Sequence, residues 1–454
     1  MPWSIVETTM TTFLTRIPLG PKGMPWLGSL PAFLADRLGF VRAAAQYGDV
    51  VNLSLGPLSG YLVTHPDLIK LVLVDRARTY LKGNSPEALK VFLGDGLVAS
   101  DGEVWLRQRR IMQPAFHRKA IAGVVSTVVD VVGRTLDELP SQGRIALQPQ
   151  LNRITMEVAA RVFFGSTVRG DAAMIERSSS IAISYLSRRA LSPIRVPSTW
   201  QTPGNRRFRQ AQAELDELIY GIINDRKHTQ PDQPDLLDLL IHAEDAETGE
   251  RLSDRQLRDQ VISLFLAGFE TTSLALAWTW SLLGQYPNVR AQLYEEVDRV
   301  LGSRPPTAED LSQLRYTRQV IEETLRLYPP IWIFWRTATQ PDTLGEYHVP
   351  ARQRVYLSPL VTHRLPELWD EPDEFRPERF DPELDVRRPR FAYFPFSGGP
   401  RQCIGNAFAM MEAQIVLAMM AQRHMYDLDG PAPKPDVGLT LKPDRTVWMR
   451  VTPR

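Results

Sequence analysis

The sequence predicts a mainly helical fold with small β-sheets, and three features support this prediction. Ser253 is a good N-cap for a long helix that extends through Leu283. Residues 124–136 place apolar side chains at helical spacing, as in an amphipathic helix. Residues 50–55 and 61–64 instead have the composition of strands and flank a Gly- and Pro-containing loop, which favours a β-hairpin. Helices should therefore form most of the fold.

The N-terminal half adds a stiff entry segment and further helices. Residues 17–23 are rich in Pro and Gly, and residues 66–191 have mainly helical patterning. The stretch 192–205 is rich in Pro, Ser and Thr, and the stretch 228–234 is polar. Both stretches are therefore expected to be loops that connect helices.

The C-terminal half alternates helices with extended segments. Pro287 is suited to the first turn of a helix, and a helix over 316–327 should end before Pro329. Extended sequence with frequent prolines then leads to a Gly-rich loop, and the apolar run 407–420 predicts a helix directly after it. Any sheets should be small and lie on one side.

Bulk composition indicates a globular protein. Of 454 residues, 43% are hydrophobic and 23% are charged, and the net charge of +1 gives no electrostatic case for nucleic-acid binding. Without a Gly/Ser linker, we expect one domain over residues 1–454, with residues 1–20 as an N-terminal arm. No apolar run is long enough to predict a transmembrane anchor, and the start does not resemble a signal peptide. A cytoplasmic location follows, with weak peripheral membrane contact through residues 10–19 left open.

A single cysteine, Cys403, lies in the Gly-rich loop. One thiol cannot form an internal disulfide or a multi-cysteine metal site, so it is an inert buried cysteine, a nucleophile or an axial thiolate on a haem iron. Gly398 and Gly405 permit an irregular backbone around it. Arg401 adds a nearby cation, and the following helix would place the sulfur near a helix N-terminus, where a thiolate is favoured.

The loop resembles the haem loop of the cytochrome P450 family. The family pattern Phe-x-x-Gly-x-Arg-x-Cys-x-Gly is matched by Phe396, Gly399, Arg401, Cys403 and Gly405. Three further segments resemble family motifs in the family's order: the oxygen-activation segment of the central helix, the Glu-x-x-Arg pair, and the segment that closes over that pair. They are residues 267–272, Glu323 with Arg326, and residues 375–380.

The resemblance implies a cytochrome P450 fold with haem b between the long central helix and the helix after the cysteine loop. Cys403 would be the iron ligand, with Phe396 beside it and Gly399 and Gly405 allowing a tight loop. The expected partners of the haem propionates are Arg401, Trp105, Arg109 and Arg336. The alternative for Arg109 is an ordinary solvated basic face with Arg107 and Arg110, and His363 is a further residue that could approach the haem.

The central segment is predicted to handle protons. Ala267 and Thr271 are four residues apart on a helix and share one face beside the haem. A threonine hydroxyl can bond the carbonyl one turn back, and splitting O₂ requires protons, so Thr271 and Glu270 are the candidate catalytic residues. Otherwise Thr271 is a core threonine and Glu270 a surface acid. Thr272 is expected to serve packing.

Two other groups complete the expected site. By resemblance, Glu323 and Arg326 are buried and joined by Arg379, which assigns them to architecture and not to catalysis. Ile331 and Phe334 should lie near an apolar substrate pocket, together with residue 267 and parts of 80–98 and 185–208. Trp332 and Trp335 make the neighbourhood bulky, although aromatic residues are as readily core as pocket.

The resemblance implies a monooxygenase that uses O₂ and a lipophilic substrate. Because no fused reductase is apparent, electrons should come from a separate ferredoxin or flavodoxin with its NAD(P)H reductase, and a monomer is expected. A basic patch could dock that partner: Arg107, Arg110, Arg118 and Lys119. The alternatives are peroxide-driven oxidation or an O₂-independent rearrangement on the same haem, and a non-enzymatic haem sensor or carrier.

Overall fold

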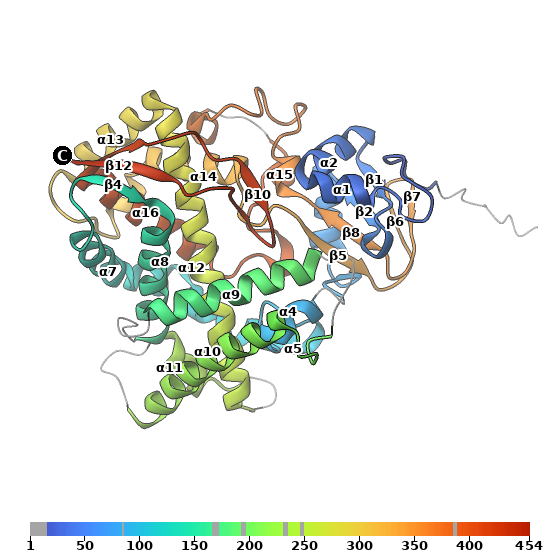
Figure 1. Ribbon diagram of the computed structural model, residues 1–454, viewed down its shortest axis with the longest axis horizontal. Coiled ribbons are helices and arrows are strands. Elements are labelled where there is room, and N and C mark those ends of the chain that lie inside the picture. The colour runs from blue at the N-terminus through green and yellow to red at the C-terminus, as the bar shows by residue number, and fades with distance from the viewer. Residues whose placement is uncertain are drawn as a thin grey trace, which may run out of the picture.

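The computed structural model describes residues 16–83, 86–165, 172–191, 197–229, 235–245, 249–384 and 388–454. A helical body fills most of the molecule, and a smaller, sheet-rich region lies to one side, built from the N-terminal segment and strands β5 and β8 (Figure 1). The mainly helical prediction with small sheets is confirmed.

The helices follow one another along most of the chain. They are α1 (Leu30–Ala35), α2 (Arg37–Ala44), α3 (Pro66–Lys70), α4 (Pro86–Leu93), α5 (Gly102–Met112), α6 (Arg118–Gly123), α7 (Val125–Asp137), α8 (Leu147–Phe164), α9 (Ala172–Leu191), α10 (Pro203–His228), α11 (Leu236–His242), α12 (Asp254–Gln285), α13 (Pro287–Leu301), α14 (Arg315–Leu327), α15 (Pro359–Thr362) and α16 (Asn406–Arg423).

The strands form small sheets. The largest described sheet has the order β1-β2-β8-β5-β3, from β1 (Val50–Leu53), β2 (Gly60–Val63), β8 (Arg354–Leu357), β5 (Phe334–Ala338) and β3 (Tyr80–Leu81). Another has the order β4-β12-β9, and two antiparallel pairs complete the set. Their strands are β4 (Gly143–Ala146), β12 (Trp448–Pro453), β9 (His424–Leu428), β6 (Asp342–Leu344), β7 (Tyr347–Val349), β10 (Pro435–Val437) and β11 (Leu441–Pro443).

The long helix α12 crosses the centre of the body (Figure 1). It begins as predicted, because Ser253 and Gln256 form a reciprocal capping box, and Pro287 opens α13. By length and mean hydropathy α12 is the one described helix that could span a membrane. However, 78% of its most apolar window is buried inside the protein, which is typical of a core helix.

Two predictions of local structure need correction. The loop expected through residue 205 ends earlier, because the Thr202 hydroxyl caps α10 by accepting from the Asn205 N–H at 3.2 Å, and Pro203 fits the first turn. The short strands β3 and β4 interrupt the mainly helical stretch 66–191, and only pairing with distant strands defines them. Residues 1–15, 192–196 and 230–234, to which the N-terminal arm and parts of both loops were assigned, lie outside the described residues.

Candidate functional site

The cysteine loop is a tight turn that precedes α16. The Cys403 N–H donates to the Phe396 carbonyl at 3.0 Å, which closes the turn. Gly399 has φ +67°, and a Cβ there would lie 1.9 Å from the Leu73 carbonyl oxygen, so both conformation and packing require glycine. At Gly405 a Cβ would meet only a ring carbon of Phe116, 3.9 Å away. Protein packing alone therefore does not require glycine at position 405.

The Cys403 side chain is solvent-accessible, although protein surrounds it. Burial raises the pKa of its thiol, while the Gly405 N–H and the Arg109 charge oppose that rise. A sulfur that is both enclosed and accessible faces internal space that the protein's own side chains do not fill. Such a thiol would become a thiolate on binding a metal.

Helix α5 carries the predicted Trp–Arg pair to this loop. Arg109 donates to the Gln402 carbonyl at 2.9 Å, and the guanidinium carbon of Arg401 lies 4.1 Å from the Trp105 ring centroid. Arg401 also forms an ion pair with Asp101, the N-cap of α5. The structure thus brings these two predicted residues of α5 into contact with the cysteine loop.

Lys82, Arg336 and Arg401 form a cationic cluster beside the loop. Arg336 is 6% exposed and donates to the neighbouring Trp335 carbonyl at 3.0 Å, and it has no carboxylate partner among the described residues. Burial lowers the pKa of Arg336 to about 10. Burial also lowers the pKa of Lys82 well below its usual range, and the charges of Arg401 and Arg336 add to this effect. Asp101 is the single carboxylate paired with this cluster among the described residues, so the cluster fits a dianionic ligand, as two propionates would be.

The middle of α12 is accessible on one face. Ala267 is exposed and Thr271 is half-buried, although buried residues flank them on both sides along the helix. The Thr271 hydroxyl donates to the Ala267 carbonyl at 2.8 Å, one turn back. The carbonyls of the four residues 267 to 270 each accept a hydrogen bond from a hydroxyl group. The donors, in the same order, are Thr271, Thr272, Thr155 and Ser273. Gly268 packs closely on α8, since a Cβ would lie 3.2 Å from the Phe163 ring.

Glu270 lies half-buried next to Thr271 on α12. Burial raises the pKa of its carboxyl to about 7, while a hydrogen bond from the Thr440 hydroxyl and the charge of Lys442 oppose the rise. Its carboxyl therefore exchanges a proton near neutral pH, which suits a general acid. The sequence did not single out Thr440, because only the folded hairpin β10–β11 brings it to α12.

Glu323, Arg326 and Arg379 form a buried ionic triad. Both carboxylate oxygens of Glu323 accept from Arg326, at 2.7 and 2.8 Å, and Arg379 lies 3.3 Å from the same carboxylate. The remaining N–H groups of Arg326 donate to the carbonyls of His363, Pro372 and Glu374. Both arginines of the triad thus face the Glu323 carboxylate, and Arg326 is fully hydrogen-bonded within the protein, whereas Nε of Arg379 makes no hydrogen bond.

His363 and the predicted pocket residues take different positions. His363 is fully buried, and its Nε2 accepts from the Phe394 N–H at 2.9 Å, so it braces the start of the cysteine loop from within the protein. Phe334 is half-buried on β5, packed edge-on against Phe394 and 5.1 Å from the Arg336 guanidinium. Ile331 is half-buried and Trp332 is buried.

The predicted docking patch is partly neutralised. Arg107 pairs with Glu250 at 2.9 Å and with Asp245 at 3.7 Å, and Arg110 also lies 3.8 Å from Asp245. Arg118 and Lys119 are exposed on α6. The surface offered to a partner is therefore less basic than the sequence suggests.

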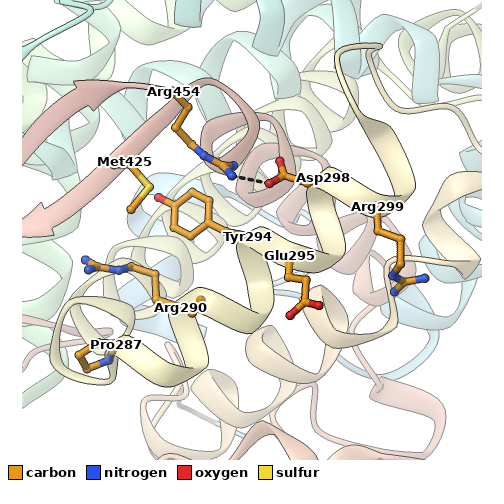
Figure 2. Close-up of a pocket in the computed structure, with 9 residues that line it drawn as sticks. Pro287, Arg290, Tyr294, Glu295, Asp298, Arg299, Met425 and Arg454 are labelled. Carbon is orange, nitrogen blue, oxygen red and sulfur yellow. Dashed lines mark hydrogen bonds and ion pairs between the residues drawn. The ribbon is translucent and has the colours of Figure 1, made fainter.

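A separate surface groove lies on α13 near the end of the chain, and none of the predicted site residues lines it (Figure 2). Its volume is about 720 Å³. Arg454 pairs there with Asp298 at 2.6 Å and lies over the Tyr294 ring, and Arg290 pairs with Asp427 at 2.7 Å. Charges satisfied in this way give no sign of a missing ligand. Within the described ranges, no group of three or more His, Cys, Asp or Glu side chains could hold a metal ion.

Comparison with known proteins gives the same family throughout. Residues 18–448 match the family model described as Cytochrome P450. The chain is 39% identical over 438 residues to "Cyclooctatin synthase" of Streptomyces melanosporofaciens, with 95% of each chain covered. It is 35% identical over 406 residues to "Cyclooctat-9-en-7-ol 5-monooxygenase" of the same organism, covering 89% of this chain and 88% of the relative.

The fold also matches a solved haem protein. The crystal structure of a mutant cytochrome P450DA heme domain has a TM-score of 0.85 at 28% identity, covering 96% of this chain and 98% of that one. Both the sequence and the architecture are thus shared over nearly the full described length. The chain therefore belongs to the cytochrome P450 family and is a haem-binding oxidoreductase of the monooxygenase class.

Proposed function

We propose that the chain binds haem b through Cys403 and inserts one oxygen atom of O₂ into a lipophilic substrate. The observation that carries this proposal is that Cys403 is accessible although protein surrounds it. Close to its loop, the cations of Lys82, Arg336 and Arg401 are paired with a single described carboxylate, that of Asp101. A bound haem with a thiolate ligand would supply O₂ binding and reductive cleavage of the O–O bond. Phe396, Gly399 and Gly405 would shape the loop that presents the sulfur.

The propionates would be held by Trp105, Arg109, Arg336 and Arg401. Of these, Arg336 is the most deeply buried, and it has no described carboxylate partner. Arg109 is fixed by the Gln402 carbonyl, and Arg401 by Asp101 and the Trp105 ring. Ala267 would lie along the face of α12 that borders the cofactor.

Glu270 and Thr271 are proposed to deliver protons. The carboxyl of Glu270 exchanges its proton near neutrality, and the Thr271 hydroxyl is anchored one turn back on the accessible face of α12. Glu323, Arg326 and Arg379 are proposed to be architectural. Ile331 and Phe334 are proposed to border the substrate, for which the relative that acts on cyclooctat-9-en-7-ol suggests an apolar ring compound with a hydroxyl group.

The remaining features are proposed at the level of the whole protein. Electrons would come from a separate ferredoxin or flavodoxin with its NAD(P)H reductase, and exposed Arg118 and Lys119 could steer an acidic partner. A single domain spanning residues 1–454, with residues 1–20 as an N-terminal arm, also remains a proposal. We further propose a monomer in the cytoplasm that does not bind nucleic acid.

Turnover under ¹⁸O₂ with NAD(P)H, a ferredoxin and its reductase tests this function. The substrate panel should consist of apolar ring alcohols, and one ¹⁸O atom should appear in the product. Oxidation that proceeds only with added peroxide, or an isomerised product without ¹⁸O, would replace the proposal with one of the alternative reactions.

Thr271→Ala tests the proton route. We expect this variant to release more of the consumed electrons as hydrogen peroxide, since the hydroxyl is lost. Thr279→Val is the matched control, because Thr279 bonds the Ala275 carbonyl in the same way on the same helix. Equal coupling in wild type and Thr271→Ala would remove Thr271 from the route.

A further inference from the structure

Thr440 touches the proposed proton donor from a distant part of the chain. It lies at the tip of the β10–β11 hairpin, is 4% exposed, and donates from Oγ1 to Glu270 Oε1 at 3.2 Å. Among the described residues, this is the one hydrogen bond to the Glu270 carboxyl. The side chain is thus placed where it can set both the direction and the protonation of the carboxyl.

The backbone around Thr440 is fixed from two sides. The Leu441 N–H donates to the Pro330 carbonyl at 2.8 Å, and the Leu441 carbonyl accepts from the Trp278 indole at 3.1 Å. The Trp332 indole donates to the Gly438 carbonyl at 3.2 Å. Because these bonds hold the tip against α12 and the segment after α14, the Thr440 hydroxyl has a defined position relative to Glu270.

The tip also contacts α9. The Leu439 N–H donates to the Ser187 hydroxyl at 3.2 Å. Helix α9 packs against α10, which in turn packs against α12. A displacement of α9 would therefore pull on the residue next to Thr440.

The charges around Glu270 are few. Lys442 of β11 is the charged side chain that acts on this carboxyl within the described ranges. It lies 3.8 Å from Asp436 and is about half exposed, so solvent weakens its influence. The nearby polar side chains of α8, Gln148 and Asn152, are neutral and bond to Ser273. A neutral hydroxyl, and not a salt bridge, is thus the direct partner of the acid.

We propose that Thr440 is the positioning residue for Glu270, and that its bond through Leu439 to Ser187 links proton delivery to the position of α9. This inference rests on the proposed role of Glu270. The Thr440 hydroxyl stabilises the ionised carboxylate, so the acid releases its proton at a lower pH than burial alone would allow.

The test is an infrared titration of the full-length, haem-loaded protein without turnover. The carbonyl band of protonated Glu270 is identified by its loss in Glu270→Gln, and its half-titration pH is then followed in variants. Thr440→Val should raise this pH by about one unit, because a hydrogen bond to a charged group is lost. Thr440→Ser should restore it, and Thr343→Val in the β6–β7 hairpin should not change it.

A second variant, Ser187→Ala, keeps the inference testable if Thr440→Val does not fold. Ser187→Ala leaves the Thr440 hydroxyl in place but removes its anchor on α9, so the half-titration pH should move in the same direction by a smaller amount. An unchanged half-titration pH in Thr440→Val, or in Ser187→Ala where only that variant folds, overturns the inference.

Coupling measurements separate this inference from the proposed role of Glu270. Thr440→Val should raise the peroxide fraction in the wild-type background and add nothing in the Glu270→Gln background. If Glu270→Gln leaves coupling unchanged, the role of Glu270 fails and the link to proton delivery fails with it. If Glu270→Gln uncouples turnover while the infrared band of Thr440→Val stays in place, only the role of Thr440 fails.

Discussion

The buried ionic triad and the cationic cluster differ in how their charges are balanced. In the triad, Glu323 faces Arg326 and Arg379, and the other N–H groups of Arg326 reach three backbone carbonyls. In the cluster, Arg336 lies as deep as Arg379 but has no described carboxylate partner. Burying an unpaired cation is costly. Both arginines of the triad therefore face a carboxylate, whereas Arg336 in the cluster faces none and would gain one from an anionic ligand.

This difference separates architecture from binding. A region whose buried cations face a carboxylate of the protein stabilises the fold whether or not a cofactor is present. A region that leaves cations unsatisfied gains its stability from the ligand, so changes there should affect ligand retention more than folding. Substitutions in the triad should therefore lower the free energy of unfolding, and substitutions in the cluster should speed haem loss.

Breaking the triad should destabilise the protein by about 3–5 kcal/mol, since one partner of a buried pair is left uncompensated. Glu323→Gln removes the central charge, and urea unfolding measures the loss. Arg318→Ala on the same helix is the control, because Arg318 is about half exposed and pairs with Glu322 at the surface. A loss below about 1 kcal/mol in Glu323→Gln would mean that the triad is not the architectural centre proposed here.

Arg336→Leu should affect haem retention and not the stability of the haem-free chain. Removing an unpaired buried cation should not lower the stability of the haem-free chain, whereas haem loss to excess apomyoglobin should be about tenfold faster or more. Arg450→Leu, an exposed arginine on β12, is the control for charge alone. If Arg336→Leu unfolds the haem-free chain but retains haem normally, the two regions do not differ as argued.

A buried acid outside both regions gives a smaller, pH-dependent effect. Glu412 is 1% exposed, and burial raises its pKa well above 4.5, while the Thr272 hydroxyl opposes the rise. The folded state thus holds this proton more tightly than the unfolded state, so its contribution to stability is present at low pH and lost as pH rises above about 4.5.

Glu412→Gln should therefore become more stable relative to wild type as pH rises, by no more than about 1.4 kcal/mol per pH unit. Urea unfolding at several pH values between about 5 and 8 measures the slope. A difference that stays constant with pH would show that Glu412 ionises freely in the folded protein.

The sequence predicted the parts of the site that depend on local spacing. The cysteine loop, the Glu270–Thr271 segment and the capped start of α12 were all read from residues close together in the chain. Trp105 and Arg109 were also placed on one helix, which the structure confirms as α5. Residues close together in the chain are positioned by the local backbone, so such motifs can be recognised without knowledge of the fold.

Contacts between distant segments could not be predicted in this way. Lys82 reads as an ordinary surface lysine in the sequence, and only packing against Arg336 and Arg401 reveals the crowding of charge. The sequence around Thr440 gives no sign of its hydrogen bond to Glu270, which lies 170 positions away in the chain. His363 was considered as a residue near the haem, but its ring is engaged by the backbone of Phe394. These roles follow from tertiary contacts alone.

The absorption spectrum of the dithionite-reduced protein with carbon monoxide tests the central claim most directly, namely that Cys403 binds haem iron as a thiolate. We predict the far-red-shifted Soret band that characterises the family in the wild-type protein, and its loss in Cys403→Ala. A conventional haem–carbon monoxide band from intact, freshly prepared wild-type protein would contradict the account.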